Sequence, residues 1–281
     1  MNELRVTFYQ QDIIWGDAEA NRQKVEKMLS DTVASASGTD IFVVPETFTT
    51  GFGDHMAALA EEQEGPTLQW ALRMAAQYDL MFVGSWIVKE KGKIYNRLHW
   101  VYPDGTYGTY DKAHTFRVSG EYDVIARGAE RKVFEYKGWR IKPAVCYDLR
   151  FPKWLRNNAE FQKLNFEESE AEKHSKFIIQ DSKLDYDLLL VCANWPGSRH
   201  EAWTTLLKAR AIENLCYVIG CNRSGVDGVD GNYTGNSALI DYKGCAVAEA
   251  APDANQTVTA TLDKEKLDSF RQKWPLYLDF D

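Results

Sequence analysis

Apolar and polar residues follow one another along the chain with two periods, one typical of strands and one typical of helices. Residues 4–8 alternate like a half-buried strand, and residues 17–36 place apolar side chains at roughly helical spacing. Residues 40–44 include a short apolar, β-branched run that ends at Pro45. This run predicts a buried strand that carries Glu46 at its C-terminal end.

The same two patterns continue to the end of the chain. They predict a short C-terminal helix, helices at 66–78 and 203–215, and strands at 80–88, 94–102, 106–110, 139–145, 187–192, 217–220, 236–241, 245–249 and 256–262. Strands that alternate with helices and hairpins imply sheets covered by helices in layers. An α/β chain of this length is often one compact domain, and no internal repeat is evident. We therefore expect a single domain over residues 1–281.

One stretch interrupts the pattern. Residues 157–183 are polar and rich in Glu and Lys, and they have no obvious apolar face. We expect this stretch to be an exposed insertion in the domain.

Charge and hydropathy limit the partners. The net charge of −8 comes from dispersed acidic residues, and Lys and Arg form no long basic run, which disfavours nucleic acid. No apolar run approaches the ~20 residues needed to cross a bilayer, and the first ten residues are too polar for a signal peptide. We expect a cytoplasmic protein without a membrane partner.

The five cysteines, at positions 146, 192, 216, 221 and 245, are odd in number and include no C-x-x-C pair. No His lies at metal-ligand spacing from them, so reduced thiols fit better than a disulfide framework or a zinc site. One of the five is then available as a nucleophile.

Polar, reactive residues follow three of the apolar strands. Glu46, Cys146 and Asn194 each stand where such a strand ends. Because loops at the carboxyl ends of strands in α/β sheets converge on a crevice, these residues could meet there. Each also has an ordinary interpretation, since a strand-end Cys is often packing and a Glu after Pro often caps a helix.

Three sequence motifs considered together are stronger evidence of function than their residues taken singly. Residues 44–48 (VPETF), 110–114 (YDKAH) and 145–152 (VCYDLRFP) resemble the Glu, Lys and Cys signatures of the nitrilase superfamily of carbon–nitrogen hydrolases. The similarity extends from Leu4 to about Ala260, and within the superfamily the chain most resembles the omega-amidases. These enzymes remove ammonia from the terminal amide of short 2-oxo acids.

The resemblance implies a four-layer α-β-β-α sandwich, commonly assembled as a homodimer or a larger homo-oligomer, that needs no cofactor or metal. It also implies that Cys146 attacks an amide carbonyl to form a thioester while Glu46 moves protons. Lys112 and the backbone N–H of Tyr147 would stabilise the oxyanion. Glu121 matches the second glutamate of the family, although a surface glutamate is its alternative interpretation. The chain departs from the family pattern in the long 157–183 stretch and at Ala113, where a larger basic residue is common.

The substrate end of the site is predicted from chemistry. A small anionic amide needs a fixed positive fork, and Arg150 meets that need because guanidinium binds carboxylate bidentately. An internal salt bridge of Arg150 with Asp148 or Glu213 is the alternative. Further candidates for the pocket wall, which could equally belong to the core or the strand ends, are Phe52, Phe116, Asn194 and Trp195.

Other functions remain open at this point. A papain-like hydrolase would pair Cys146 with His114 or His200 as the base, but no matching motif surrounds either histidine. A carbamoylase or a deaminated-glutathione amidase of the same superfamily would share all three catalytic residues. A catalytically inactive binding subunit would not need Glu46, Lys112 and Cys146 together.

Overall fold

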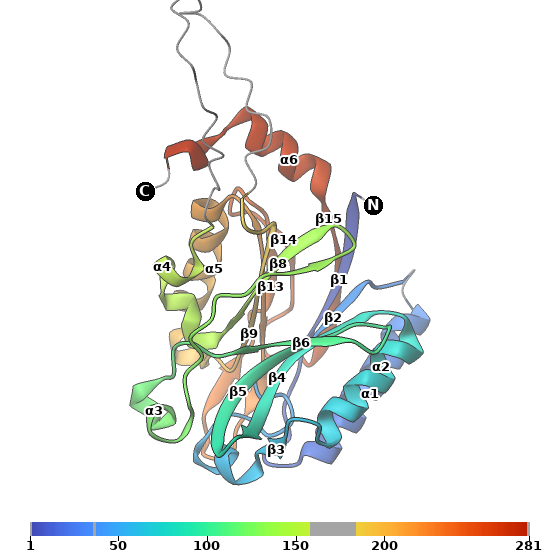
Figure 1. Ribbon diagram of the computed structural model, residues 1–281, viewed down its shortest axis with the longest axis vertical. Helices are drawn as coiled ribbons and strands as arrows, with labels where there is room; N and C mark the ends of the chain where they lie inside the picture. The colour runs from blue at the N-terminus through green and yellow to red at the C-terminus, as the bar shows by residue number, and fades with distance from the viewer. Residues whose placement is uncertain (1, 36–37, 158–183, 280–281) are drawn as a thin grey trace, which may run out of the picture.

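The computed structural model describes residues 2–35, 38–157 and 184–279. In this part of the chain two β-sheets lie against each other, and helices cover their outer faces (Figure 1). The first sheet has the strand order β15-β1-β2-β4-β5-β6, with β3 added beside β4, and the second has the order β14-β13-β10-β9-β8-β7. The arrangement is the α-β-β-α sandwich that the sequence predicted.

The strands have the following bounds. The first sheet contains β1 (Glu3–Gln10), β2 (Ile41–Val43), β3 (Glu61–Glu62), β4 (Met81–Glu90), β5 (Lys93–Val101), β6 (Tyr107–Asp111) and β15 (Gln256–Asp263). The second contains β7 (Phe134–Tyr136), β8 (Trp139–Val145), β9 (Leu188–Ala193), β10 (Tyr217–Asn222), β13 (Ala238–Ile240) and β14 (Ala246–Glu249). A separate hairpin is formed by β11 (Ser224–Val226) and β12 (Asn232–Thr234).

The helices are α1 (Ala18–Ser35), α2 (Pro66–Tyr78), α3 (Glu121–Val124), α4 (Pro152–Leu155), α5 (His200–Asn214) and α6 (Lys264–Lys273). Short 3-10 turns occupy Asp54–Leu59, Arg117–Ser119, Cys146–Arg150, Gly197–Arg199 and Leu276–Asp279. None of the described helices is long and apolar enough to span a membrane.

Alternating side chains of the strands fill two kinds of core. On β2, Ile41 and Val43 point toward the second sheet, whereas Phe42 packs under the α1–α2 layer. On β9, Leu188 and Leu190 likewise join the core between the sheets, and their neighbours pack under α5. Because strands of this kind are buried on both faces, they appear in the sequence as continuous apolar runs.

One glycine controls the approach of α5 to the second sheet. A Cβ placed on Gly220 in β10 would lie 2.5 Å from a Leu207 methyl carbon and 2.6 Å from the Trp203 ring. Any larger residue would push α5 away from β10. This contact matters for function because α5 begins directly after the segment that follows β9.

Most predicted elements are present, and the bounds predicted for α2 and β8 agree with the structure. Helix α5 begins at His200, three residues before the predicted start. Strand β7 and the β11–β12 hairpin were not predicted, because they are short and, unlike β2, contain no continuous apolar run.

The predicted insertion at about 157–183 lies outside the described residues, apart from Asn157. This residue is buried, and its Nδ2 donates hydrogen bonds to the backbone oxygens of Tyr186 (2.9 Å) and Asn214 (3.0 Å). The single-domain organisation stays a prediction.

Candidate active site

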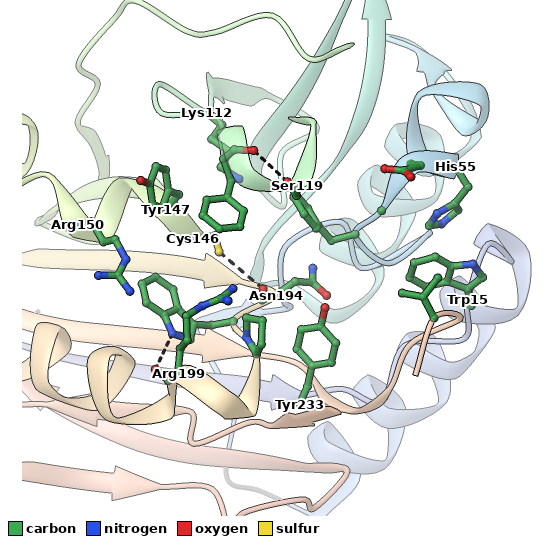
Figure 2. Close-up of a pocket in the computed structure, with 17 residues that line it drawn as sticks. Trp15, His55, Lys112, Ser119, Cys146, Tyr147, Arg150, Asn194, Arg199 and Tyr233 are labelled. Carbon is green, nitrogen blue, oxygen red and sulfur yellow. Dashed lines mark hydrogen bonds between the residues drawn. The ribbon is translucent and has the colours of Figure 1, made fainter. Parts of the chain in front are cut away.

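The three motif residues stand at the ends of strands from both sheets. Glu46 follows β2, Lys112 follows β6 in the same sheet, and Cys146 follows β8 in the facing sheet. The structure brings them together beside a cavity of about 670 Å³, whose wall includes Lys112 and Cys146 (Figure 2). Glu46 lies behind this wall and has no exposed surface.

A buried charge cluster surrounds Lys112. Its Nζ lies 2.8 Å from Glu46 Oε1 and 2.9 Å from each carboxylate oxygen of Glu121, and all three side chains are at most 1% exposed. Burial alone would lower the pKa of Lys112, but the carboxylates of Glu121 and Glu46 outweigh it and hold the pKa above its usual value. Lys112 therefore stays a cation, and its charge is balanced inside the protein.

Glu121 belongs to the cluster, as its match to the second family glutamate predicted. Glu121 begins α3, and its Oε2 accepts a 2.6 Å hydrogen bond from the backbone N–H of Phe116. Burial and the nearby Glu46 raise the pKa of Glu121, and Lys112 opposes them. The surface alternative is wrong, because Glu121 is almost fully buried.

Glu46 is held from several directions. Its Oε2 accepts the backbone N–H of Asn194 at 2.8 Å, and its Oε1 accepts Asn96 Nδ2 at 2.8 Å in addition to Lys112. The Asn194 side chain also donates to the backbone oxygen of Glu46 and to Thr47 Oγ1. Asn194 thus joins the β2 end to the β9 end and fixes the carboxylate.

The two strand ends that carry Glu46 and Cys146 both turn through an unusual backbone conformation. Thr47 has φ 42° and Cys146 has φ 44°. L-residues with side chains rarely adopt positive φ, at a cost of roughly 1–2 kcal/mol each, and such positions cluster at functional sites. At Cys146 the sharp turn directs the thiol into the cavity (Figure 2).

The Cys146 thiol is protonated at rest. Burial and the neighbouring carboxylate of Glu46 raise its pKa well above the usual value, and the Lys112 ammonium partly opposes them. Its Sγ lies 3.8 Å from the backbone oxygen of Asn194. A thiol in this state needs a base in order to react, and Glu46 is the adjacent acceptor.

Asp148 secures the turn that follows the thiol. Its Oδ2 accepts the backbone N–H of Val145 at 3.0 Å and the Tyr110 hydroxyl at 2.8 Å, while its Oδ1 accepts His114 Nδ1 at 2.7 Å. His114 is also stacked on Phe151, with ring centroids 3.7 Å apart. Asp148 therefore ties the Lys112 segment to the Cys146 segment.

Neither histidine of the papain-like alternative lines the cavity. His114 is engaged by Asp148, and His200 is exposed, with its Nδ1 beside the backbone oxygen of Gly197 and its Nε2 3.1 Å from Glu201. The carboxylate of Glu46, by contrast, interacts with the Cys146 thiol.

The cavity wall includes all the predicted substrate residues, Phe52, Phe116, Arg150, Asn194 and Trp195. It also includes Tyr147, whose backbone N–H was predicted to stabilise the oxyanion. Arg150 is exposed, and its guanidinium carbon lies 4.9 Å from the Trp195 ring centroid. The salt-bridge alternative for Arg150 is wrong, since Asp148 is occupied as above and Glu213 pairs with Arg210 at 2.9 Å.

Other residues at the site were missed by the sequence analysis. Trp15 and His55 form one end of the cavity, with ring centroids 3.9 Å apart, and Arg199 and Tyr233 add to its wall. Asn96 lies under the charge cluster on β5. No group of three or more His, Cys, Asp or Glu side chains in the described ranges is arranged to hold a metal ion.

We predict that Asn96 positions the carboxylates. Its Nδ2 donates to Glu46 Oε1 at 2.8 Å and reaches Glu121 Oε1 at 3.4 Å, while its own Oδ1 has no partner among the described residues. Asn96→Leu keeps the branched shape of the side chain and removes both polar atoms, of which only Nδ2 has a partner among the described residues. A hydrogen bond to a charged group contributes roughly 1.5–3 kcal/mol, so we expect kcat to fall about 10- to 100-fold with KM nearly unchanged.

Steady-state kinetics of Asn96→Leu, together with thermal unfolding to verify the fold, would measure this effect. An unchanged kcat in a folded variant would show that Asn96 is not needed to position Glu46.

The comparisons with known proteins agree with this geometry. The carbon–nitrogen hydrolase family model matches residues 5–272. The omega-amidase YafV of Yersinia enterocolitica is 39% identical over 100% of this chain and 98% of its own length, and the 2-oxoglutaramate amidase of Bacillus subtilis is 29% identical over 98% and 96%. The crystal structure of a CN-hydrolase superfamily protein from Xanthomonas campestris, which carries an arsenic adduct in its active site, is 40% identical, with a TM-score of 0.90 over 100% of this chain and 98% of that one. The chain therefore belongs to the carbon–nitrogen hydrolase family.

Proposed function

We propose that this protein is an omega-amidase that converts the terminal amide of a short 2-oxo acid to the free acid and ammonia. The observation that carries the proposal is the buried Lys112, held between two carboxylates beside a strained, protonated cysteine that faces a cavity. Relatives named omega-amidase and 2-oxoglutaramate amidase match over nearly the full length of this chain. The family match and these relatives support hydrolysis of a carbon–nitrogen bond other than a peptide bond.

The first half of the reaction forms a thioester. Glu46 takes the proton of the Cys146 thiol while the sulfur attacks the amide carbon, and the carbonyl electron pair moves onto oxygen. The Lys112 ammonium and the Tyr147 N–H face this oxyanion. As the tetrahedral intermediate collapses, the carbon–nitrogen bond breaks and Glu46 returns the proton to the departing nitrogen, which leaves as ammonia.

The second half of the reaction releases the acid. Glu46 takes a proton from a water molecule, whose oxygen attacks the thioester carbon. The carbon–sulfur bond then breaks, and Glu46 returns the proton to Cys146. One carboxyl group thus serves as base and acid in turn, which explains why Asn194 and Asn96 hold it so closely.

Lys112 contributes charge and no proton in this scheme. Its pKa is raised by Glu121 and Glu46, so it remains an ammonium throughout the cycle. Glu121 serves to position Lys112, because both of its oxygens accept hydrogen bonds from Nζ.

A panel of amides tests this function directly. We expect rapid ammonia release from 2-oxoglutaramate and 2-oxosuccinamate and slow release from neutral amides of equal length, because a neutral amide leaves the guanidinium groups of the cavity unpaired. N-carbamoyl amino acids and deaminated glutathione represent the alternative amidases of the superfamily. A preference for either of these would replace the proposed substrate while keeping the chemistry, and inactivity toward every amide would favour a binding subunit.

We further propose that the protein works in the cytoplasm as a homodimer or a larger homo-oligomer. The free state of all five cysteines supports a reducing compartment, and the family resemblance supports self-association. Light scattering of the purified protein would give the oligomeric state, and a monomeric mass would rule the assembly out.

A further inference from the structure

Two guanidinium groups reach the cavity without a carboxylate partner. Arg150 and Arg199 both line it, both are exposed, and neither forms a salt bridge within the described residues. Several other arginines do have a carboxylate partner, as Arg97 has Asp111 at 2.6 Å and Arg210 has Glu213 at 2.9 Å. These two side chains therefore bring positive charge without a carboxylate partner to the cavity of a chain whose net charge is −8.

The position of Arg199 is well defined. It ends the 3-10 turn Gly197–Arg199 directly before α5, and its backbone oxygen accepts Trp195 Nε1 at 2.9 Å. Its guanidinium carbon lies 5.4 Å from the ring centroid of Phe116, a residue of the segment that follows β6. The side chain thus connects two different parts of the cavity wall.

The two arginines share one end of the cavity. Figure 2 shows Arg150 to the left of Cys146 and Arg199 below it, with Trp15 and His55 at the far right of the cavity. The Trp195 indole contacts both residues, through the Arg150 guanidinium and the Arg199 backbone. This end is cationic and aromatic, whereas the other end is mainly aromatic.

The remaining cation of the wall is not available to bind an anion. Lys112 is already neutralised by Glu46 and Glu121, and the acidic residue in the wall is Asp54, which belongs to the loop that carries His55. The start of α5, a 15-residue helix, adds a partial positive charge beside Arg199. An anionic group is thus favoured at the arginine end.

We propose that Arg199 is a specificity-determining residue that, together with Arg150, binds the acidic end of the substrate. The proposal rests on the proposed amidase function and deepens it. Each guanidinium presents a planar fork of N–H donors. A 2-oxo acid presents two carboxylate oxygens and an adjacent carbonyl oxygen. One guanidinium can bind the carboxylate, and the second can bind the 2-oxo oxygen, an acceptor that a simple carboxylate lacks. The aromatic rings of Phe116 and Trp195 hold the two forks by cation–π contacts.

The test compares Arg199→Met with the parent on three amides of matched length: 2-oxoglutaramate, glutaramate without the oxo group, and neutral pentanamide. We expect kcat/KM for 2-oxoglutaramate to fall about 10- to 100-fold, mainly through KM, because a charge-assisted hydrogen bond is lost. Glutaramate should lose less, and pentanamide should change less than about twofold. In Arg150→Met/Arg199→Met the preference for acidic amides should disappear.

Arg73→Met is the matched control, since Arg73 is an exposed arginine of α2 outside the cavity wall. A second readout does not depend on turnover: calorimetry of 2-oxoglutarate, the reaction product, binding to the parent and to Arg199→Met should show a Kd raised at least about tenfold in the variant. Thermal unfolding verifies that the variants are folded.

The outcomes separate this inference from the function on which it rests. If the parent releases ammonia from 2-oxoglutaramate but Arg199→Met does so equally well, Arg199 does not bind substrate and only the inference fails. Equal losses on 2-oxoglutaramate and pentanamide would reduce Arg199 to a packing role. If the parent ignores acidic amides altogether, the proposed function itself is wrong.

Discussion

Replacement of Cys146 by Ala is expected to abolish ammonia release while leaving the protein folded. The thiol is the nucleophile of the scheme, and removal of such a group from a catalytic set lowers kcat by roughly 10⁴-fold or more. The backbone turn should survive, because Ala at φ 44° bears the same strain as Cys. Steady-state ammonia release, with circular dichroism to check the fold, measures both effects.

The remaining cysteines supply the controls. Cys245 is exposed, and Cys192 is buried in the core between the sheets. Cys245→Ala should retain full activity, and Cys192→Ala should lose only some stability by leaving a small cavity. Substantial turnover by Cys146→Ala, or its loss in Cys245→Ala, would move the nucleophile elsewhere.

The second large expected effect is the loss of activity on replacing Glu46 or Lys112, which act in different ways. Glu46→Gln removes proton transfer and should lower kcat by roughly 10²- to 10⁴-fold. Lys112→Met removes an oxyanion donor and should cost roughly 10²- to 10³-fold. Rates alone would not distinguish the two roles, but the reactivity of the thiol does.

The two variants should shift the pKa of the Cys146 thiol in opposite directions. Glu46 raises the pKa of Cys146 and Lys112 lowers it. The pH profile of Cys146 alkylation by iodoacetamide should therefore move to lower pH in Glu46→Gln and to higher pH in Lys112→Met. Shifts in the same direction would show that the two groups do not act on the thiol as charges of opposite sign.

The thermal stability of the two variants must be measured as well, because Lys112 also stabilises the fold. Its removal leaves Glu46 and Glu121 buried without a cation, and breaking a buried pair in this way costs roughly 3–5 kcal/mol. Glu46→Gln keeps the geometry and leaves Lys112 paired with Glu121. We therefore expect a marked drop in Tm for Lys112→Met and a small one for Glu46→Gln, so activity must be compared well below both melting temperatures.

The strand-end residues were predictable because their signals are local. An apolar run followed by a reactive residue indicates a strand that delivers this residue to a sheet edge, and Glu46 and Cys146 both stand in such places. Asn194 also follows directly from its strand. That these ends would meet followed from the family motifs and not from the apolar pattern alone.

The other site residues depend on packing that no local pattern encodes. Asn96 is a polar residue within β5, and such a residue would ordinarily face solvent; it is buried because Glu46 and Glu121 come to it from other elements. Arg199 resembles a solvated charge at a helix start, and only the fold brings it to Phe116. Trp15 and Tyr233 come from opposite ends of the chain, and a wall made of both requires the tertiary structure.

The most direct test of the account is to trap the covalent intermediate. The protein would be mixed with 2-oxoglutaramate, quenched with acid within the first turnovers, and measured by intact mass spectrometry followed by peptide mapping. We predict a mass increase equal to the acyl group left after loss of ammonia, located on Cys146, released by hydroxylamine and absent from Cys146→Ala. Burst release of ammonia without any acyl adduct, or an adduct on another cysteine, would contradict the mechanism.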